Sequence, residues 1–396
     1  MVRGDSVPGS YSSVLTVVIP FFPMPYPGEI FFSTCARYSD RARLDYTGST
    51  RSRSPRVLSR VLFGTADRKL AVDLPTNLDH LIMALPPSHL LTAAQIIDKH
   101  TLYPYYQPFL VPQRRPQIVA AMHGNTARAS MRSGRKSRTK LFPQGLRYCP
   151  ICIEQDKAAW GEPYWHRVHQ AIGVYVCPLH PFFLENSSVP YSRITSAFDG
   201  WVSASRAVSH ATAGHPVDEN NHVHNILMRI ARDVTWLIDV NPIVDPTLLQ
   251  RQYMNRLLEL DMATQGGVAR MQHVFRRFEE YYPQTFLADI SCVVDPQNNS
   301  NWLFSLSRPA SIHVAHPLHH LLFIQFLGYT LEEFVSFPIE QRPFGNGPWP
   351  CLNRGADHWC RGSTCSWDGV ARSRPGSTSR STSARRGASP SAARST

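Results

Sequence analysis

Cys149-Pro-Ile-Cys152 and Cys177-Pro-Leu-His180 are two short motifs, separated by residues 153–176, from which the interpretation of this chain of 396 residues begins. In each motif two residues lie between the potential ligands, a spacing at which a tight turn directs both side chains towards one ion. Thiolate sulfur and imidazole nitrogen are ligands that Zn²⁺ prefers, and four of them complete a tetrahedral shell. The sequence therefore predicts one structural zinc ion bound by Cys149, Cys152, Cys177 and His180.

Two further histidines, His166 and His169, lie between the motifs and compete as ligands, although His180 has the better spacing to its partner. A catalytic zinc keeps one position open for water, so four protein ligands indicate a structural ion. The alternative is four unlinked residues in a core or on the surface. Eight cysteines are too few for a disulfide scaffold in a chain of this length, and they fit metal binding in a reducing compartment.

Positive charge is concentrated just before the first motif. The chain carries 41 Lys or Arg against 29 Asp or Glu, a formal net charge of +12, which favours a polyanionic partner. Residues 112–147 contain nine Lys or Arg and no acidic residue. This segment either contacts DNA phosphates or forms a solvated, flexible face. Its candidate DNA contacts are Arg132, Arg135, Lys136, Arg138, Lys140 and Arg147.

A second candidate DNA surface follows from helical periodicity. Apolar residues recur at close to 3.6-residue spacing in 247–261 and in 268–282, and Gly266-Gly267 separates the two stretches. The pair resembles a helix-turn-helix, in which the second helix reads DNA. The alternative is an ordinary helix pair in a core. The candidate contacts on the second helix are Arg270, Gln272, Arg276 and Arg277.

The sequence predicts a mainly α protein with small helical domains around a structural zinc-binding module. The longest apolar run, residues 14–22, is much shorter than the roughly 20 residues that a transmembrane helix needs. Residues 369–396 are mostly Ser, Arg, Ala, Gly and Pro, which cannot form a core. The predicted segments are 1–23 (flexible arm), 24–111 (helical N-terminal part), 112–186 (basic segment and zinc module), 187–221 (linker), 222–355 (helical DNA-binding region) and 356–396 (disordered tail).

These residues together resemble the TniQ/TnsD family of transposon target-site selection proteins over about residues 24–355. The resemblance is clearest around the two metal motifs. It includes Met24-Pro-Tyr-Pro-Gly-Glu29, Thr101-Leu-Tyr-Pro-Tyr-Tyr-Gln-Pro-Phe109, Leu146-Arg-Tyr-Cys-Pro-Ile-Cys152, Tyr164-Trp-His-Arg-Val-His-Gln170, Gly173-Val-Tyr-Val-Cys-Pro-Leu-His180 and Pro343-Phe-Gly-Asn-Gly-Pro-Trp-Pro-Cys351. Longer members continue with further DNA-reading domains, where this chain has an Arg/Ser-rich end. Cys351, His358, Cys360 and Cys365 are irregularly spaced and leave a second metal site open.

The resemblance implies a non-enzymatic protein that binds double-stranded target DNA and recruits an AAA+ ATPase transposition regulator, which then activates a separate transposase. An alternative from another class is an interaction adaptor that links an RNA-guided effector complex to the regulator and reads little DNA itself. No Gly-rich phosphate loop is present, so ATP hydrolysis is assigned to a partner. The expected location is cytoplasmic and associated with the nucleoid, with no membrane contact and no small-molecule substrate.

Overall fold

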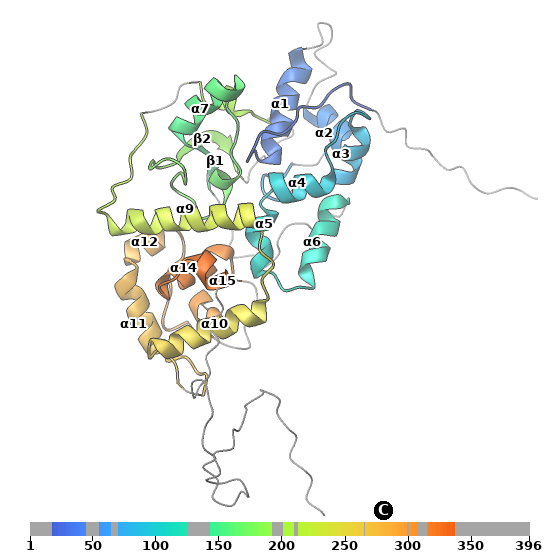
Figure 1. Ribbon diagram of the computed structural model, residues 1–396. Coiled ribbons are helices and arrows are strands. Elements are labelled where there is room, and N and C mark those ends of the chain that lie inside the picture. Colours follow the sequence, from blue (N-terminus) through green and yellow to red (C-terminus); the bar gives the residue numbers. More distant parts are fainter. Residues whose placement is uncertain are drawn as a thin grey trace, which may run out of the picture. The chain divides into compact units, whose positions relative to one another are not determined.

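The computed structural model describes residues 18–44, 55–64, 70–124, 143–191, 201–209, 213–264, 266–298, 301–307 and 315–336. Within these ranges the chain forms fifteen α-helices and one two-stranded sheet, which confirms the predicted mainly α fold (Figure 1). All of them lie in a compact unit that ends at Ile339. The predicted tail at 356–396 and the cluster around Cys351 lie outside the described residues. None of the described helices combines the length and the apolar character needed to cross a bilayer.

The N-terminal helices share one core. They are α1 (Phe31–Leu44), α2 (Pro55–Phe63), α3 (Leu78–Ala84), α4 (Ala93–His100), α5 (Tyr103–Tyr106) and α6 (Arg114–His123), with the 3₁₀ turn η1 (Gln107–Phe109) between the last two. A capping box opens α4: the Thr92 hydroxyl accepts from the Gln95 backbone N–H, and the Gln95 side chain accepts from the Thr92 N–H. Helix α6 contacts α3 and α4, so the start of the predicted basic segment belongs to this helical group.

The packed body begins earlier than predicted. Ile19 and Phe22 are buried, and the Ile19 N–H donates to the carbonyl of Ala84 at 2.8 Å. The prediction of a flexible arm over 1–23 is therefore wrong for residues 18–23, because Ile19 is bonded to the end of α3 and Phe22 packs against Phe31 and Tyr38 of α1. The residues before position 18 lie outside the described part of the chain.

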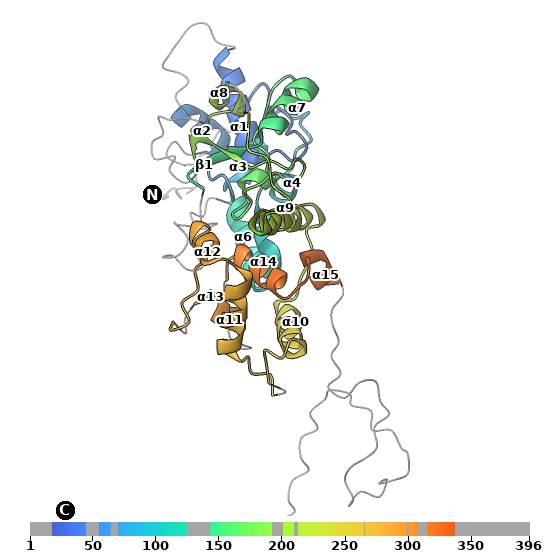
Figure 2. The ribbon, with the colours of Figure 1, turned by 90° about the vertical axis from the view of Figure 1, so that its left-hand side faces the viewer.

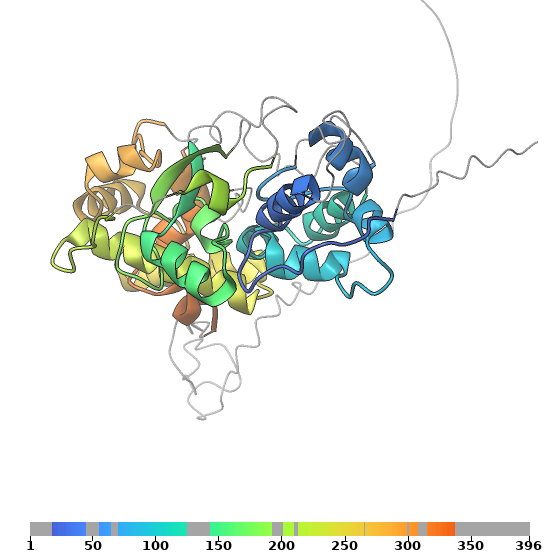
Figure 3. The same ribbon diagram turned by 90° about the horizontal axis from the view of Figure 1, so that it is seen from above.

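The sheet consists of β1 (Gly145–Tyr148) and β2 (Glu185–Pro190), which pair antiparallel with Arg147 opposite Asn186. Both strands lie with α7 (Pro150–Trp160) in the green part of Figure 3. The last four residues of β2 and the buried Trp201 fall within 187–221, the segment predicted as a linker. Among the described residues of that segment, the end of β2 is thus held by backbone pairing with β1, which composition does not reveal.

Helix α9 (His222–Val240) is the longest described helix and opens with an Asn221 cap. It contacts α5 and the 3₁₀ turn η3 (Val168–Gln170), and also two of the helices that follow it, α14 and α15. The remaining helices are α8 (Ala204–Ala207), α10 (Pro246–Glu259), α11 (Met271–Tyr281), α12 (Gln284–Asp289), α13 (Trp302–Leu306), α14 (Pro317–Phe326) and α15 (Leu331–Ser336).

Helices α10 and α11 form where the helix pair was predicted, but their connection is longer than the three- or four-residue turn of a helix-turn-helix (Figure 2). The connecting residues fold back on themselves: Ala263 and Ala269 form a β-bridge, and the Arg270 N–H donates to the Met262 carbonyl at 2.8 Å. Gly267 adopts a φ of 74° at the turn, which a glycine tolerates without strain. The connection is therefore a small hairpin.

Candidate functional site

The first metal motif lies where the sheet passes into a helix. Strand β1 ends at Tyr148, Cys149 is the N-cap residue of α7, and Cys152 lies in the first turn of that helix. Pro150 occupies the first helical position, where the missing N–H has no intrahelical partner to lose. The strand-to-helix turn thereby places both sulfur atoms on the same side of the helix start.

The second motif lies on a tight hairpin. Val176 and Phe183 form a β-bridge, the Cys177 N–H donates to the Phe182 carbonyl at 2.9 Å, and the Phe182 N–H donates to the His180 carbonyl at 2.7 Å. This turn brings Cys177 and His180 to the same point, opposite the start of α7.

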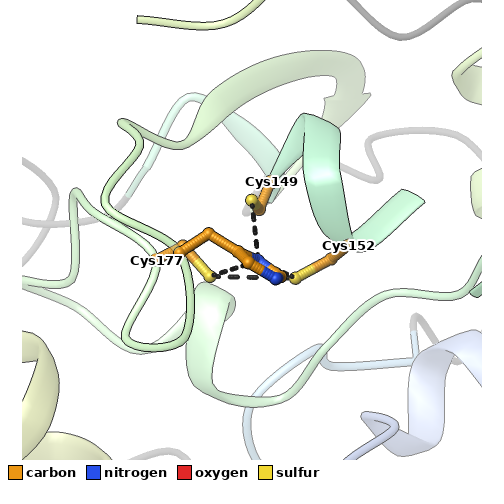
Figure 4. A group of neighbouring side chains, drawn as sticks. Cys149, Cys152 and Cys177 are labelled. Carbon is orange, nitrogen blue, oxygen red and sulfur yellow. Dashed lines mark hydrogen bonds between the residues drawn. The ribbon is translucent and has the colours of Figure 1, made fainter. Parts of the chain in front are cut away.

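The four side chains form one cluster, with their ligand atoms within 4.8 Å of one another. Figure 4 shows the three cysteines converging from the start of α7 and from the hairpin. The Cys152 and Cys177 sulfurs are 3.7 Å apart, and the His180 Nδ1 lies 3.6, 3.3 and 3.7 Å from the sulfurs of Cys149, Cys152 and Cys177. A zinc tetrahedron with ordinary bond lengths has S···S edges of about 3.8 Å and S···N edges of about 3.6 Å. These separations are close to the edges of such a tetrahedron, so the cluster could hold one metal ion, and its three sulfurs and one imidazole nitrogen are consistent with zinc.

The thiols of the cluster are electrostatically linked. Hydrogen bonds from the other two thiols lower the pKa of Cys149, while hydrogen bonding to Cys149 raises the pKa of Cys152 and raises that of Cys177 to about 12. Without a cation, one thiolate is thus stabilised at the expense of its neighbours. A divalent ion at the centre would stabilise all three thiolates, since a coordinating thiol is deprotonated by the metal charge.

The loop between the two motifs packs against several helices and contributes no further ligand to the cluster. His166 is held by Asp156 of α7 at 2.9 Å, and the metal-ligand cluster found among the described residues contains neither His166 nor His169. His169 is buried, and desolvation lowers its pKa well below the ordinary value, so its ring is neutral. The two histidines therefore pack beside the cluster.

Two other residues of this loop connect distant elements. The Trp165 N–H donates to the Ser33 hydroxyl at 3.1 Å, and its indole N–H donates to the Val202 carbonyl at 2.9 Å. The buried Arg167 donates to the carbonyl of Asp98 at 2.6 Å and to that of Ile238 at 3.4 Å. This loop thus ties α1, α4 and α9 to the metal cluster, which the ligand spacing alone does not predict.

Arg147 does not serve as a DNA contact. Its side chain is only 3% exposed, and its guanidinium donates to the Ala171 carbonyl at 2.7 Å. Its backbone N–H and C=O both bond the Gln170 side chain, and desolvation lowers its pKa to about 10. The prediction of a phosphate contact was wrong because β1 is buried along its whole length. Arg147 instead clamps β1 to the loop between the motifs.

The other predicted DNA contacts fall into two groups. Arg270, Gln272, Arg276 and Arg277 are exposed between the residue before α11 and the middle of that helix, and three of them line a surface hollow of 680 Å³ together with Met271 and His273. His273, which the sequence also places on this helix, lies one helical turn before Arg276 or Arg277 and is partly exposed. The second group lies outside the described residues: Arg132, Arg135, Lys136, Arg138 and Lys140.

Two sequence families match consecutive parts of the chain. The TniQ family matches residues 20–184, and the family described as Tn7-like transposition protein D, TnsD, matches residues 230–363. The curated relative "Transposon Tn7 transposition protein TnsD" of Escherichia coli is 30% identical over 161 residues, which is 40% of this chain. The chain matches 30% of that relative's length. The metal cluster lies inside the first match and α11 inside the second, and the two matches together with this relative support the TniQ/TnsD family for the chain.

Proposed function

We propose that this protein selects the insertion site of a Tn7-like transposon by binding target DNA and recruiting an AAA+ transposition regulator. The observation that carries the proposal is the order of the two matches, TniQ followed by TnsD, along one chain. The regulator in turn activates a separate transposase, so the protein itself cuts no DNA. It acts in the cytoplasm, at the nucleoid.

We also propose that Cys149, Cys152, Cys177 and His180 bind one structural Zn²⁺. Their ligand atoms have the separations of a tetrahedral shell, and three of the four residues are buried. A filled shell leaves no position for an activated water, which supports a role in folding rather than in catalysis. The zinc would hold the start of α7 against the hairpin and thereby fix the loop that ties the helices together.

The DNA-binding part of the proposal is supported by charge. Arg270, just before α11, and Arg276 and Arg277, at its middle, are exposed, and the whole chain carries a net charge of +12. Arginine side chains that neutralise phosphates release counterions, so affinity for duplex DNA should fall steeply as salt rises. We retain Arg132, Arg135, Lys136, Arg138 and Lys140 as proposed phosphate contacts from their sequence alone.

The proposal is tested with the full, zinc-loaded chain. Binding to labelled duplexes from the target region and to unrelated duplexes is measured at several salt concentrations. The genes beside this one are searched for an AAA+ ATPase, and any such protein is assayed for co-purification. A target selector prefers one duplex by at least the roughly 10³-fold typical of specific DNA-binding proteins. Equal affinity for all duplexes, together with capture of an RNA-guided effector, would identify the adaptor instead. Metal-dependent cleavage of DNA by the purified chain would contradict both.

A further inference from the structure

Helix α11 presents one fixed, polar face. Its opposite side buries Val274, Phe275 and Phe278. Phe278 packs edge-on against Trp302 with ring centroids 5.5 Å apart, and Phe275 contacts Phe304 at 6.1 Å. Because these aromatic contacts anchor the helix to α13, its exposed side chains project from a rigid support. A rigid support is what side chains need to recognise a partner in one register.

Charge is divided along this face. Arg270 directly precedes α11, and Arg276 and Arg277 lie at its middle, whereas Glu279 and Glu280 follow in its last turn, and all five residues are exposed. A polyanion that approached the whole length of α11 would meet the two carboxylates and be repelled. Only the N-terminal half is compatible with close approach to nucleic acid.

Gln272 and Arg276 are the two side chains of this half that are best placed to meet bases. They are four residues apart on the helix and line the same 680 Å³ hollow. Arg270 is held at 2.7 Å by Asp261, so its guanidinium is engaged at the edge of the hollow. Arg276 approaches Glu280 only at 3.9 Å, with both side chains more than half exposed, so its guanidinium is loosely held.

We propose that α11 enters the DNA major groove by its N-terminal half, and that Gln272 reads an adenine and Arg276 a guanine within two base pairs of it. This inference rests on the proposed function. Glutamine pairs with adenine N6 and N7, and arginine with guanine O6 and N7, in bidentate geometry. Residues four apart on a helix are separated by about 6 Å along the axis, against about 3.4 Å per base step. The two side chains therefore reach base pairs about two steps apart.

The experiment selects preferred duplexes from a randomised pool with the full chain and with four variants, Gln272→Ala, Arg276→Ala, Arg277→Ala and Arg60→Ala. Arg60 lies on α2 and is exposed, so it controls for the loss of one positive charge elsewhere. Gln272→Ala should lose the preference for adenine at one position, and Arg276→Ala the preference for guanine at a nearby one. Each should lower affinity for the selected duplex on the order of 10- to 100-fold.

The outcomes separate the inference from the proposed function. Arg277→Ala should weaken all duplexes alike, because a phosphate contact carries no sequence information, and Arg60→Ala should leave binding unchanged. If the full chain selects a sequence and both Gln272→Ala and Arg276→Ala keep it, the readout by α11 is refuted while target selection stands. A uniform loss over all sequences in those two variants also refutes the readout. If the unaltered chain selects no sequence, the proposed function fails.

Discussion

Removal of a single metal ligand should have a larger effect than removal of any other buried thiol. Cys149→Ser and Cys177→Ser each delete one corner of the cluster, whereas Cys292→Ser makes the same chemical change at a buried cysteine outside it. The purified chain should hold one zinc, and each ligand variant should lose it. The control should keep it.

The expected magnitude follows from the cluster geometry. With S···N separations of 3.3 to 3.7 Å, all four ligand atoms can bind one ion at ordinary bond lengths, so little binding energy is lost to strain. Structural zinc contributes about 10–16 kcal/mol in small zinc domains, comparable with the whole stability of a typical domain. A ligand variant should therefore unfold the region around α7. Cys292→Ser should cost only about 1–3 kcal/mol, the cost of burying a hydroxyl.

Zinc stoichiometry, X-ray absorption at the zinc edge and thermal unfolding together check this prediction. The absorption spectrum should give three sulfurs at about 2.3 Å and one nitrogen at about 2.0 Å. Full zinc occupancy in both ligand variants would refute the assignment. A spectrum with two nitrogens and two sulfurs would also refute it, because it would place His166 or His169 in the shell.

Three further predictions concern burial. Desolvation lowers the pKa of His319 and of His320 to about 3, against about 6.5 in the unfolded chain. Between these two pKa values unfolding takes up two protons, so the free energy of unfolding decreases as the pH falls from about 6.5 towards 3. Urea unfolding at pH 7.5 and pH 5 should differ by about 2–4 kcal/mol from this pair, and His319→Leu should roughly halve that difference. Arg147→Ala should lower stability by about 1–3 kcal/mol in chemical denaturation, yet leave duplex affinity unchanged; a large loss of affinity in the folded variant would restore it as a DNA contact. Gly173→Ala should lower the melting temperature, because φ is 92° and the added Cβ would lie 2.6 Å from the Leu318 side chain, and an unchanged melting temperature would contradict this.

Local chemistry made part of the structure predictable. The capping pair at Thr92 acts over three residues, and so does the pair at Thr330, where the backbone N–H of Glu333 donates to the Thr330 hydroxyl at 3.2 Å. The metal motifs also follow from local structure. The two ligands of each motif are three residues apart, and a single turn of the chain brings their side chains together. Contacts between residues three apart depend only on the residue types at those positions, which the sequence shows directly.

Other features depend on partners far along the chain. Arg147 belongs to a run of basic residues, and only its pairing with Asn186 and its bond to the Ala171 carbonyl reveal that it is buried. Trp201 likewise lies in a stretch rich in small polar residues, and it is buried edge-on against Phe63 at a ring separation of 5.9 Å. Composition therefore misassigned both residues, because burial is decided by tertiary packing.

The position of the metal cluster suggests why the proposed structural ion would affect the proposed DNA binding by α11. Arg167, in the loop between the two metal motifs, donates to the carbonyl of Ile238 at 3.4 Å, and Gly173 lies against the side chain of Leu318. Both partners fall within residues 230–363, the part that matches TnsD, whereas the loop falls within the part that matches TniQ. Loosening the loop by loss of zinc would therefore weaken contacts between the two matched parts. A ligand variant should then lose sequence-selective DNA binding together with zinc, although none of the ligands lies on α11.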